Sequence, residues 1–301
     1  MSAHGLRIGI VQLLDSAPVL LAREFGYFTQ AGLDVTVVIE PSWANIADKL
    51  AYGMLDAAVI LGPLAVAMTL GLRGRPSALR FAGTLSRNGN AIVLAAGRAA
   101  APVRFAVVHA YSNHDLLLRD WIAASGMALA DASIITLPPP DMVNALERGS
   151  IDGFCSGAPW GSVAVRQGAG IITAVSADLA PDHPEKLLVL RAEFADAQPM
   201  AAAALRDALG AATSLCGTAS ARRDLAAILA APHNLDLPSS VLEAALTPSV
   251  GNPVFMTGVA LRPAVADLEW TIARMQAAGH LAGTDPAQAV ATLMGTSSVS
   301  D

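Results

Sequence analysis

The stretch "NIADKLAYGMLDAAVILGP" (residues 45–63) decides the fold, because "DMVNALERGSIDGFCSGAP" (residues 141–159) repeats its pattern. Four positions of the first copy have a counterpart 96 residues later, in the pairs Leu50 and Leu146, Gly53 and Gly149, Asp56 and Asp152, and Pro63 and Pro159. Solenoid repeats recur at about 20–50 residues. The spacing therefore predicts two similar α/β lobes in one chain.

Each copy has the pattern of a helix that a glycine ends, followed by a strand. The helices are predicted at 42–52 and 141–149 and the strands at 55–60 and 151–156. Upstream of each copy, apolar β-branched runs at 6–14 and 33–40, and at 103–110 and 132–140, flank amphipathic helices at 16–32 and 112–126. Strands that alternate with helices indicate parallel sheets.

The order of these elements predicts where the chain passes between the lobes. Crossovers are expected near 97–102 and near 177–186, so that lobe one comprises residues 1–100 and 187–301 and lobe two comprises residues 101–186. Alanine-rich helices from residue 197 onward are expected to flank lobe one. Two lobes joined by two crossovers form a hinge with a cleft.

Composition excludes several classes of function. The 301 residues are 53% apolar and 15% charged with a net charge of −6, which predicts a packed core and no general attraction to nucleic acid or anionic membranes. Cys155 and Cys216 are expected to be buried apolar residues, and no histidine pattern indicates a metal site. Nucleophile, phosphate-loop and dinucleotide motifs are absent, so an enzyme is not expected.

The N-terminus and the most apolar window give an expectation about location. The first residues lack a basic segment followed by a long apolar run and a cleavage site, and the window 57–72 contains Gly62 and Pro63 and is shorter than a spanning helix. The sequence therefore predicts a soluble cytoplasmic protein, unless an export signal was replaced at Met1.

Three predicted helix starts, at Ser16, Ser42 and Ser112, follow strands, and such ends favour a small anion. Trp43 either packs onto its own lobe or lines the cleft, where its indole N–H would be a hydrogen-bond donor. His114 is an exposed first-turn residue, a hydrogen-bonded cleft histidine without a role in binding, or a ligand donor whose protonated form a bound anion would favour.

Two further positions have a structural and a functional interpretation. Asn90 is either a turn residue or a polar contact. Lys186 is by default a solvent-exposed lysine, and only its place at a predicted crossover between the lobes suggests a role in binding.

Several motifs together resemble one family, the nitrate- and bicarbonate-binding proteins of ABC transporters, which have a two-lobed type II periplasmic-binding-protein fold. The motifs are "DSAPVLLAREFGYFTQAGLDV", "SWANIADKLAYGMLDAAVILGP", "NGNAIVLA", "SNHDLLLRDWIAASG", "PPPDMVNALERGSIDGFCSGAPW", "HPEKLLVLR" and "VALRPAVADLEWTIARMQAAGHL". They span residues 6–282 in the order of the family. Within it the chain most resembles the cytoplasmic NasS-type nitrate/nitrite sensor.

The resemblance implies a ligand set and a role. The ligand residues of the family fall on Trp43, Asn90, His114 and Lys186. The bicarbonate branch has an acidic residue and calcium at the place of Lys186, so the lysine implies nitrate or nitrite with no metal or cofactor. Asn90 replaces the usual glutamine, and Ala158 replaces the glutamate of the family's "GEPW" motif.

The expected function is a cytoplasmic sensor that controls release of an ANTAR-type (NasT-type) transcription antiterminator. Two alternatives remain at this point. One is the solute-binding component of a nitrate-type ABC transporter, and the other is an enzyme on the same fold with a reactive Cys155 or histidine.

Overall fold

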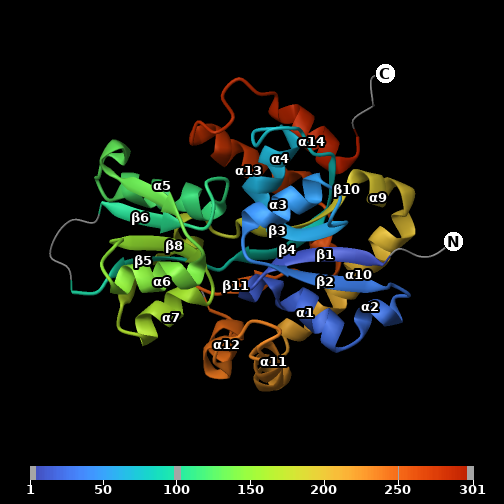
Figure 1. Cartoon of the computed structure of the whole chain (residues 1–301), viewed down its shortest axis with the longest axis horizontal. Helices are drawn as coiled ribbons and strands as arrows, with labels where there is room; N and C mark the ends of the chain where they lie inside the picture. Colours follow the sequence, from blue (N-terminus) through green and yellow to red (C-terminus); the bar gives the residue numbers. More distant parts are fainter. Residues whose placement is uncertain (1–4, 98–102, 250, 297–301) are drawn as a thin grey trace.

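The computed structural model describes residues 5–97, 103–249 and 251–296 and contains two lobes, each built on its own β-sheet (Figure 1). The larger sheet has the strand order β11-β4-β10-β3-β1-β2 and the smaller has the order β7-β6-β8-β5-β9. The strands are β1 (Leu6–Val11), β2 (Val35–Glu40), β3 (Ala57–Leu61), β4 (Leu79–Asn88), β5 (Asn90–Ala95), β6 (Arg104–Val107), β7 (Ser133–Thr136), β8 (Gly153–Gly157), β9 (Gly170–Val175), β10 (Pro184–Arg191) and β11 (Pro253–Phe255).

The two lobes repeat one arrangement of parallel strands, as the 96-residue spacing predicts. Strand β1 lies between β3 and β2, and β6 lies between β8 and β7 in the same way. The equivalent side chains form equivalent bonds. The Arg7 guanidinium donates to the Asp56 carboxylate and to the Gly53 carbonyl, and Arg104 donates to Asp152 and Gly149. The repeated sequence thus encodes a repeated half-sheet.

Helices cover both faces of the larger sheet. One face packs against α1 (Ala17–Glu24), α2 (Tyr27–Gln30), α9 (Ala192–Ala197), α10 (Pro199–Cys216), α11 (Arg222–Leu229) and α12 (Ser239–Leu246). The other packs against α3 (Trp43–Ala51), α4 (Gly62–Thr69), α13 (Val265–Ala277) and α14 (Pro286–Met294). Lobe two carries α5 (Asn113–Ala124), α6 (Pro139–Glu147), α7 (Trp160–Arg166) and α8 (Ser176–Leu179). Short 3₁₀ turns are η1 (Leu14–Ser16), η2 (Leu129–Asp131), η3 (Ala219–Ala221) and η4 (Gly258–Leu261).

Strand β3 shows how the core is divided. Its five residues are all buried, and Ala57 and Val59 face one apolar cluster while Ala58 and Ile60 face the other. A strand covered on both faces needs such a continuous apolar run. The second of these clusters also contains Phe154 of lobe two, so apolar contacts run from one lobe into the other.

The first crossover lies at another position than the sequence suggests. Strands β5 and β6 both belong to the smaller sheet, so the chain passes between the lobes at Gly89, not near 97–102. Most of that predicted crossover, residues 98–102, lies outside the described residues. Gly89 has φ +85°, and a Cβ there would lie 2.9 Å from the backbone of Pro253, so the turn requires glycine.

The return to lobe one lies within the predicted crossover near 177–186. Strand β9 and α8 belong to lobe two and β10 is in the larger sheet, so the chain returns between residues 180 and 183. His183 precedes β10, and the whole of β10 belongs to lobe one. The sheets and α8 therefore assign residues 90–179 to lobe two, where the sequence suggests 101–186.

Two simpler expectations can be compared directly with the structure. Cys155 and Cys216 are both buried and neither forms a disulfide, as predicted. Within residues 5–97, 103–249 and 251–296, no helix has the length and apolar character that crossing a membrane would require.

Candidate functional site

Four residues from four separate elements meet between the lobes. Trp43 begins α3, Asn90 begins β5, His114 lies in the first turn of α5 and Lys186 lies in β10. Each is at most 2% exposed. The structure thus gathers all four sequence-predicted residues into one buried cluster, and it surrounds them with polar residues that the sequence did not single out.

Lys186 is the centre of the cluster on the side of lobe one. Its ammonium lies 2.5 Å from Glu185 Oε1, 3.4 Å from Asp15 Oδ2 and 5.6 Å from the centre of the Trp43 ring. Burial alone would lower the pKa of Lys186, but the two carboxylates raise it above its ordinary value. The lysine is therefore charged and fully buried.

Lobe two supplies the opposite side through β5 and α5. Asn90 Nδ2 donates to Glu185 Oε2 at 2.7 Å, and Asn113 Nδ2 donates to the same oxygen at 2.9 Å. His114 Nε2 lies 3.9 Å from Glu185 Oε1. The Ser112 hydroxyl accepts from the Asp115 N–H and caps α5, so the first turn of this helix is held against the cluster.

Glu185 and Lys186 are consecutive, yet both side chains reach the same site. In a regular strand successive side chains point to opposite faces. The pairing of β10 with β4 is irregular around Lys186, with register shifts on both sides of it. Such a bulge re-aims side chains. Strict alternation along β10 would place Glu185 and Lys186 on opposite faces of the sheet. The sequence therefore did not indicate Glu185 as a site residue, although it precedes Lys186 in "HPEK".

The histidines of the cluster are neutral in this arrangement. Burial, the main cause, lowers the pKa of His114 to about 3 against the opposing effect of Glu185. Burial also lowers the pKa of His183, whose Nδ1 lies 3.6 Å from Glu185 Oε2. The protonated His114 that an anion would favour is therefore not the form that the chain alone stabilises.

Two side chains of the cluster carry buried nitrogens with no hydrogen-bond partner among the described residues. They are the indole nitrogen of Trp43, a donor, and both ring nitrogens of His114, of which the neutral ring has one donor and one acceptor. Buried polar groups are usually hydrogen-bonded, so each such donor needs an explanation. A Cβ added to Gly157 would lie 3.4 Å from Asp15 Oδ2, 3.5 Å from Asn90 Oδ1 and 3.7 Å from His114 Nε2. Gly157 thus has room for a small group at its Cα between the lobes.

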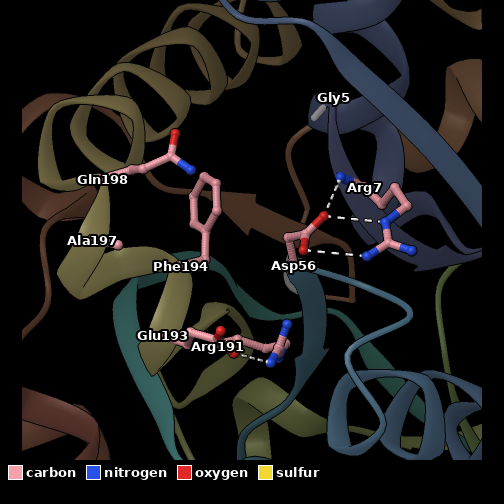
Figure 2. Close-up of a pocket in the computed structure, with 8 residues that line it drawn as sticks. All are labelled: Gly5, Arg7, Asp56, Arg191, Glu193, Phe194, Ala197 and Gln198. Atoms are coloured by element: carbon pink, nitrogen blue, oxygen red, sulfur yellow. Dashed lines mark hydrogen bonds and ion pairs between the residues drawn. The ribbon is translucent and has the colours of Figure 1, made fainter. Parts of the chain in front are cut away.

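A surface pocket of about 620 Å³ lies at the far end of the larger sheet (Figure 2). Its charged side chains are already paired, because Arg7 bonds to Asp56 and Arg191 bonds to Glu193. It lies where β1 and β3 begin, whereas Lys186 pairs with Leu61 at the end of β3. Ligands of α/β sheets bind at the carboxyl ends of strands, so the cluster around Lys186 is the better candidate.

The chemistry of the cluster suits binding of a small polar group and suits a metal less well. The described residues contain no group of three or more His, Cys, Asp or Glu side chains arranged to hold a metal ion. Cys155 is buried in the core of lobe two, and burial raises the pKa of its thiol well above the ordinary value. An unreactive thiol gives no support to the enzyme alternative.

The two sheets and their helices define a protein with the two-lobed periplasmic-binding-protein fold. The structure superimposes on the periplasmic nitrate-binding protein NrtA of Synechocystis with a TM-score of 0.86 and 25% identity, over 96% of this chain and 85% of that one. It also matches an alkanesulfonate-binding protein SsuA of Xanthomonas axonopodis in fold, with a TM-score of 0.76 and 19% identity, over 95% and 97% of the two chains. Residues 2–230 match the NMT1-like family, and the chain belongs to that family.

Curated relatives are named for nitrate and for bicarbonate; one of the latter, the bicarbonate transport ATP-binding protein CmpC of Synechococcus elongatus, is 33% identical over 269 residues, which covers 81% of this chain and 41% of the relative. The chain is 33% identical over 248 residues to the nitrate/nitrite binding protein NrtA of Synechocystis, which covers 74% of this chain and 56% of the relative. It is 38% identical over 249 residues to the nitrate import ATP-binding protein NrtC of the same organism, which covers 76% and 37%. The chain thus spans about a third to just over half of the length of these curated relatives.

Proposed function

We propose that this chain is a solute-binding protein for nitrate or nitrite, which it holds between its lobes. The observation that carries the proposal is the fully buried, charged Lys186 beside the unpartnered Trp43 indole of lobe one and the His114 imidazole of lobe two. Preformed donors around a cation suit a small planar oxyanion. Similarity to proteins named for nitrate supports this choice of anion. The proposal includes binding and no catalytic step.

Trp43→Phe tests the site with little disturbance, because it removes an indole N–H that has no partner among the described residues and keeps an aromatic ring. A hydrogen bond to an anion contributes about 1.5–3 kcal/mol, so we expect nitrate or nitrite affinity to fall by about 10- to 100-fold. Calorimetric titration of salt-free protein measures it, with bicarbonate, bicarbonate plus calcium, and an alkanesulfonate as competing ligands.

Trp121→Phe is the matched control, because Trp121 packs against Phe105 inside lobe two and outside the cluster. It should bind like the unaltered protein. Equal affinity in both variants would show that Trp43 does not contact the anion. If only the sulfonate bound tightly, the ligand would be a sulfonate and not nitrate or nitrite.

The physiological role of anion binding, in transport or in sensing, is a separate proposal. The relatives named for nitrate import support a receptor that delivers the anion to an ABC transporter, and they support it better than the sensor expected from the sequence. The cytoplasmic location, the sensor role and the ANTAR-type partner stay predictions.

A co-elution experiment separates the two roles. A sensor forms a complex with the antiterminator that nitrate or nitrite dissociates, because the anion and the partner stabilise different forms of the chain. A transport receptor forms no such complex and stimulates ATP hydrolysis by the transporter when nitrate is present. Either result decides the role without changing the proposed ligand.

A further inference from the structure

The carboxylate of Glu185 already accepts hydrogen bonds from the donors that a bound anion would use. It accepts from Lys186 at 2.5 Å, from Asn90 at 2.7 Å and from Asn113 at 2.9 Å, and His114 Nε2 lies 3.9 Å away. A carboxylate is planar and spreads one negative charge over its two oxygens, as nitrite does over two and nitrate over three. The chain's own side chain therefore resembles the proposed ligand and competes with it.

A second buried carboxylate, Asp15, contacts the same lysine. Its Oδ2 lies 3.4 Å from Lys186 Nζ, and its Oδ1 accepts from the Ser86 hydroxyl at 2.5 Å. Burial is the main reason that the pKa of Asp15 is raised. Among the described residues, no arginine forms an ion pair with Asp15 or Glu185. Two carboxylates thus share one ammonium group.

The other groups around Glu185 do not supply a full positive charge. His114 in α5 and His183 ahead of β10 are neutral at pH 7, and the Cys155 thiol in β8 is protonated. The start of α5 contributes a partial positive charge of about one half. With Asp15 and Glu185 both ionised, the site has two carboxylates for one ammonium group before any ligand enters, and the raised pKa makes Asp15 the carboxyl that most readily takes up a proton.

Adding an anion to this site while both carboxyls are ionised places three negative groups around one lysine in a fully buried region. Charges interact strongly there, because the effective dielectric constant is low. Buried charges without a counter-charge usually take up a proton. Entry of an anion with one proton leaves the charge of the site unchanged.

We propose that this site binds its anion together with one proton, and that Glu185 is the residue that imposes the requirement. The inference rests on the proposed function. The proton comes from solvent as the ligand enters, and Asp15, His114 and Glu185 share it around Lys186. Nitrate stays ionised, and no covalent bond to the ligand forms or breaks. Binding of the anion and of the proton are then reciprocal.

Calorimetric titration of the unaltered protein with nitrate tests this without any substitution. At one pH, two buffers that differ in ionisation enthalpy should give binding heats that differ by the amount for one proton taken up. Between pH 6.5 and 8.5, affinity should fall by about tenfold per pH unit. Equal heats in both buffers together with a constant affinity would overturn the inference and leave the proposed function intact.

Glu185→Gln gives an independent measurement, because it keeps the shape of the side chain and removes its charge. We expect nitrate to bind at least about tenfold more tightly, with proton uptake well below one. If Glu185 served only to accept from Asn90 and Asn113, the amide would weaken binding instead. Glu193→Gln is the control, because Glu193 is an exposed partner of Arg191.

The two proposals fail in different ways. No heat with nitrate or nitrite at any pH in this range would contradict the proposed function, and the proton requirement with it. Binding without proton uptake contradicts the proton requirement alone. Should Glu185→Gln not fold, the two-buffer titration of the unaltered protein still decides the question.

Discussion

Lys186 shows how much one residue contributes here to both stability and binding. Its ammonium is fully buried between Asp15 and Glu185, and it is the one lysine of β10. Removing one partner of a buried ion pair leaves an uncompensated charge, which costs about 3–5 kcal/mol. The residue that holds an anion in the proposed site is therefore also the one that keeps two carboxylates compatible with burial.

Lys186→Met is expected to lower the free energy of unfolding by about 3–5 kcal/mol at pH 7. Urea denaturation measures it. Lys49→Met makes the same change at a half-exposed lysine that pairs with Glu40 at 2.6 Å, and it should cost less. Equal losses in both variants would contradict a special role for burial at Lys186.

At the scale of elements, the repeated half-sheets are held by repeated side-chain bonds. Asp152 accepts from the backbone N–H groups of Val103 and Arg104 and from the Arg104 guanidinium. The Arg104 side chain, the main cause, lowers the pKa of Asp152 to about 2. The carboxylate thus ties the start of β6 to the turn before β8.

Asp152→Asn should destabilise the protein by about 1–3 kcal/mol at pH 7, because the amide cannot accept from all of these donors. The folded pKa of Asp152 lies below the unfolded one, so its stabilisation is complete above about pH 4 and is lost as the pH falls toward 2. Urea denaturation at pH 7 and at pH 2.5 should show the difference between variant and unaltered protein shrinking. Asp131→Asn, at an exposed position, is the control. If Asp152→Asn lowered the free energy of unfolding equally at both pH values, the interpretation would be contradicted.

At the scale of the whole molecule, α13 joins the lobes. It packs on α4 and β10 of lobe one, while Arg274 forms an ion pair with Asp120 of α5 in lobe two. His280, just after α13, lies 3.5 Å from Asp115 and packs edge-on against the Tyr111 ring. Helix α13 and the turn after it therefore contact both lobes (Figure 1).

Arg274→Ala should favour the open arrangement without touching the site. A partly exposed ion pair contributes about 0.2–1 kcal/mol, and apparent affinity scales with the fraction of closed protein. We therefore expect nitrate affinity to fall by up to about fivefold, with a larger radius of gyration in X-ray scattering without ligand. Arg191→Ala breaks an ion pair within lobe one and is the control. An unchanged nitrate affinity and an unchanged radius of gyration would contradict a role of α13 in closure of the lobes.

The sequence by itself determined the two lobes and the four central residues of the site. Equivalent residues 96 apart, such as Asp56 and Asp152, predict equivalent half-sheets because local patterning and turn chemistry act within each lobe. Trp43, Asn90, His114 and Lys186 were found from helix starts and from family resemblance, and the structure brings them together. Their role as ligands stays a prediction.

Only the tertiary structure decided the crossovers and the electrostatics of the site. The passage at Gly89 depends on which sheet β5 joins, and strand pairing over long sequence separations is not contained in local pattern. Asp15, Asn113, Gly157 and Glu185 join the site through packing between lobes and through the irregular register of β10. The sign of the charge around Lys186 follows from that packing, because it is burial that turns neighbouring carboxylates into strong electrostatic partners.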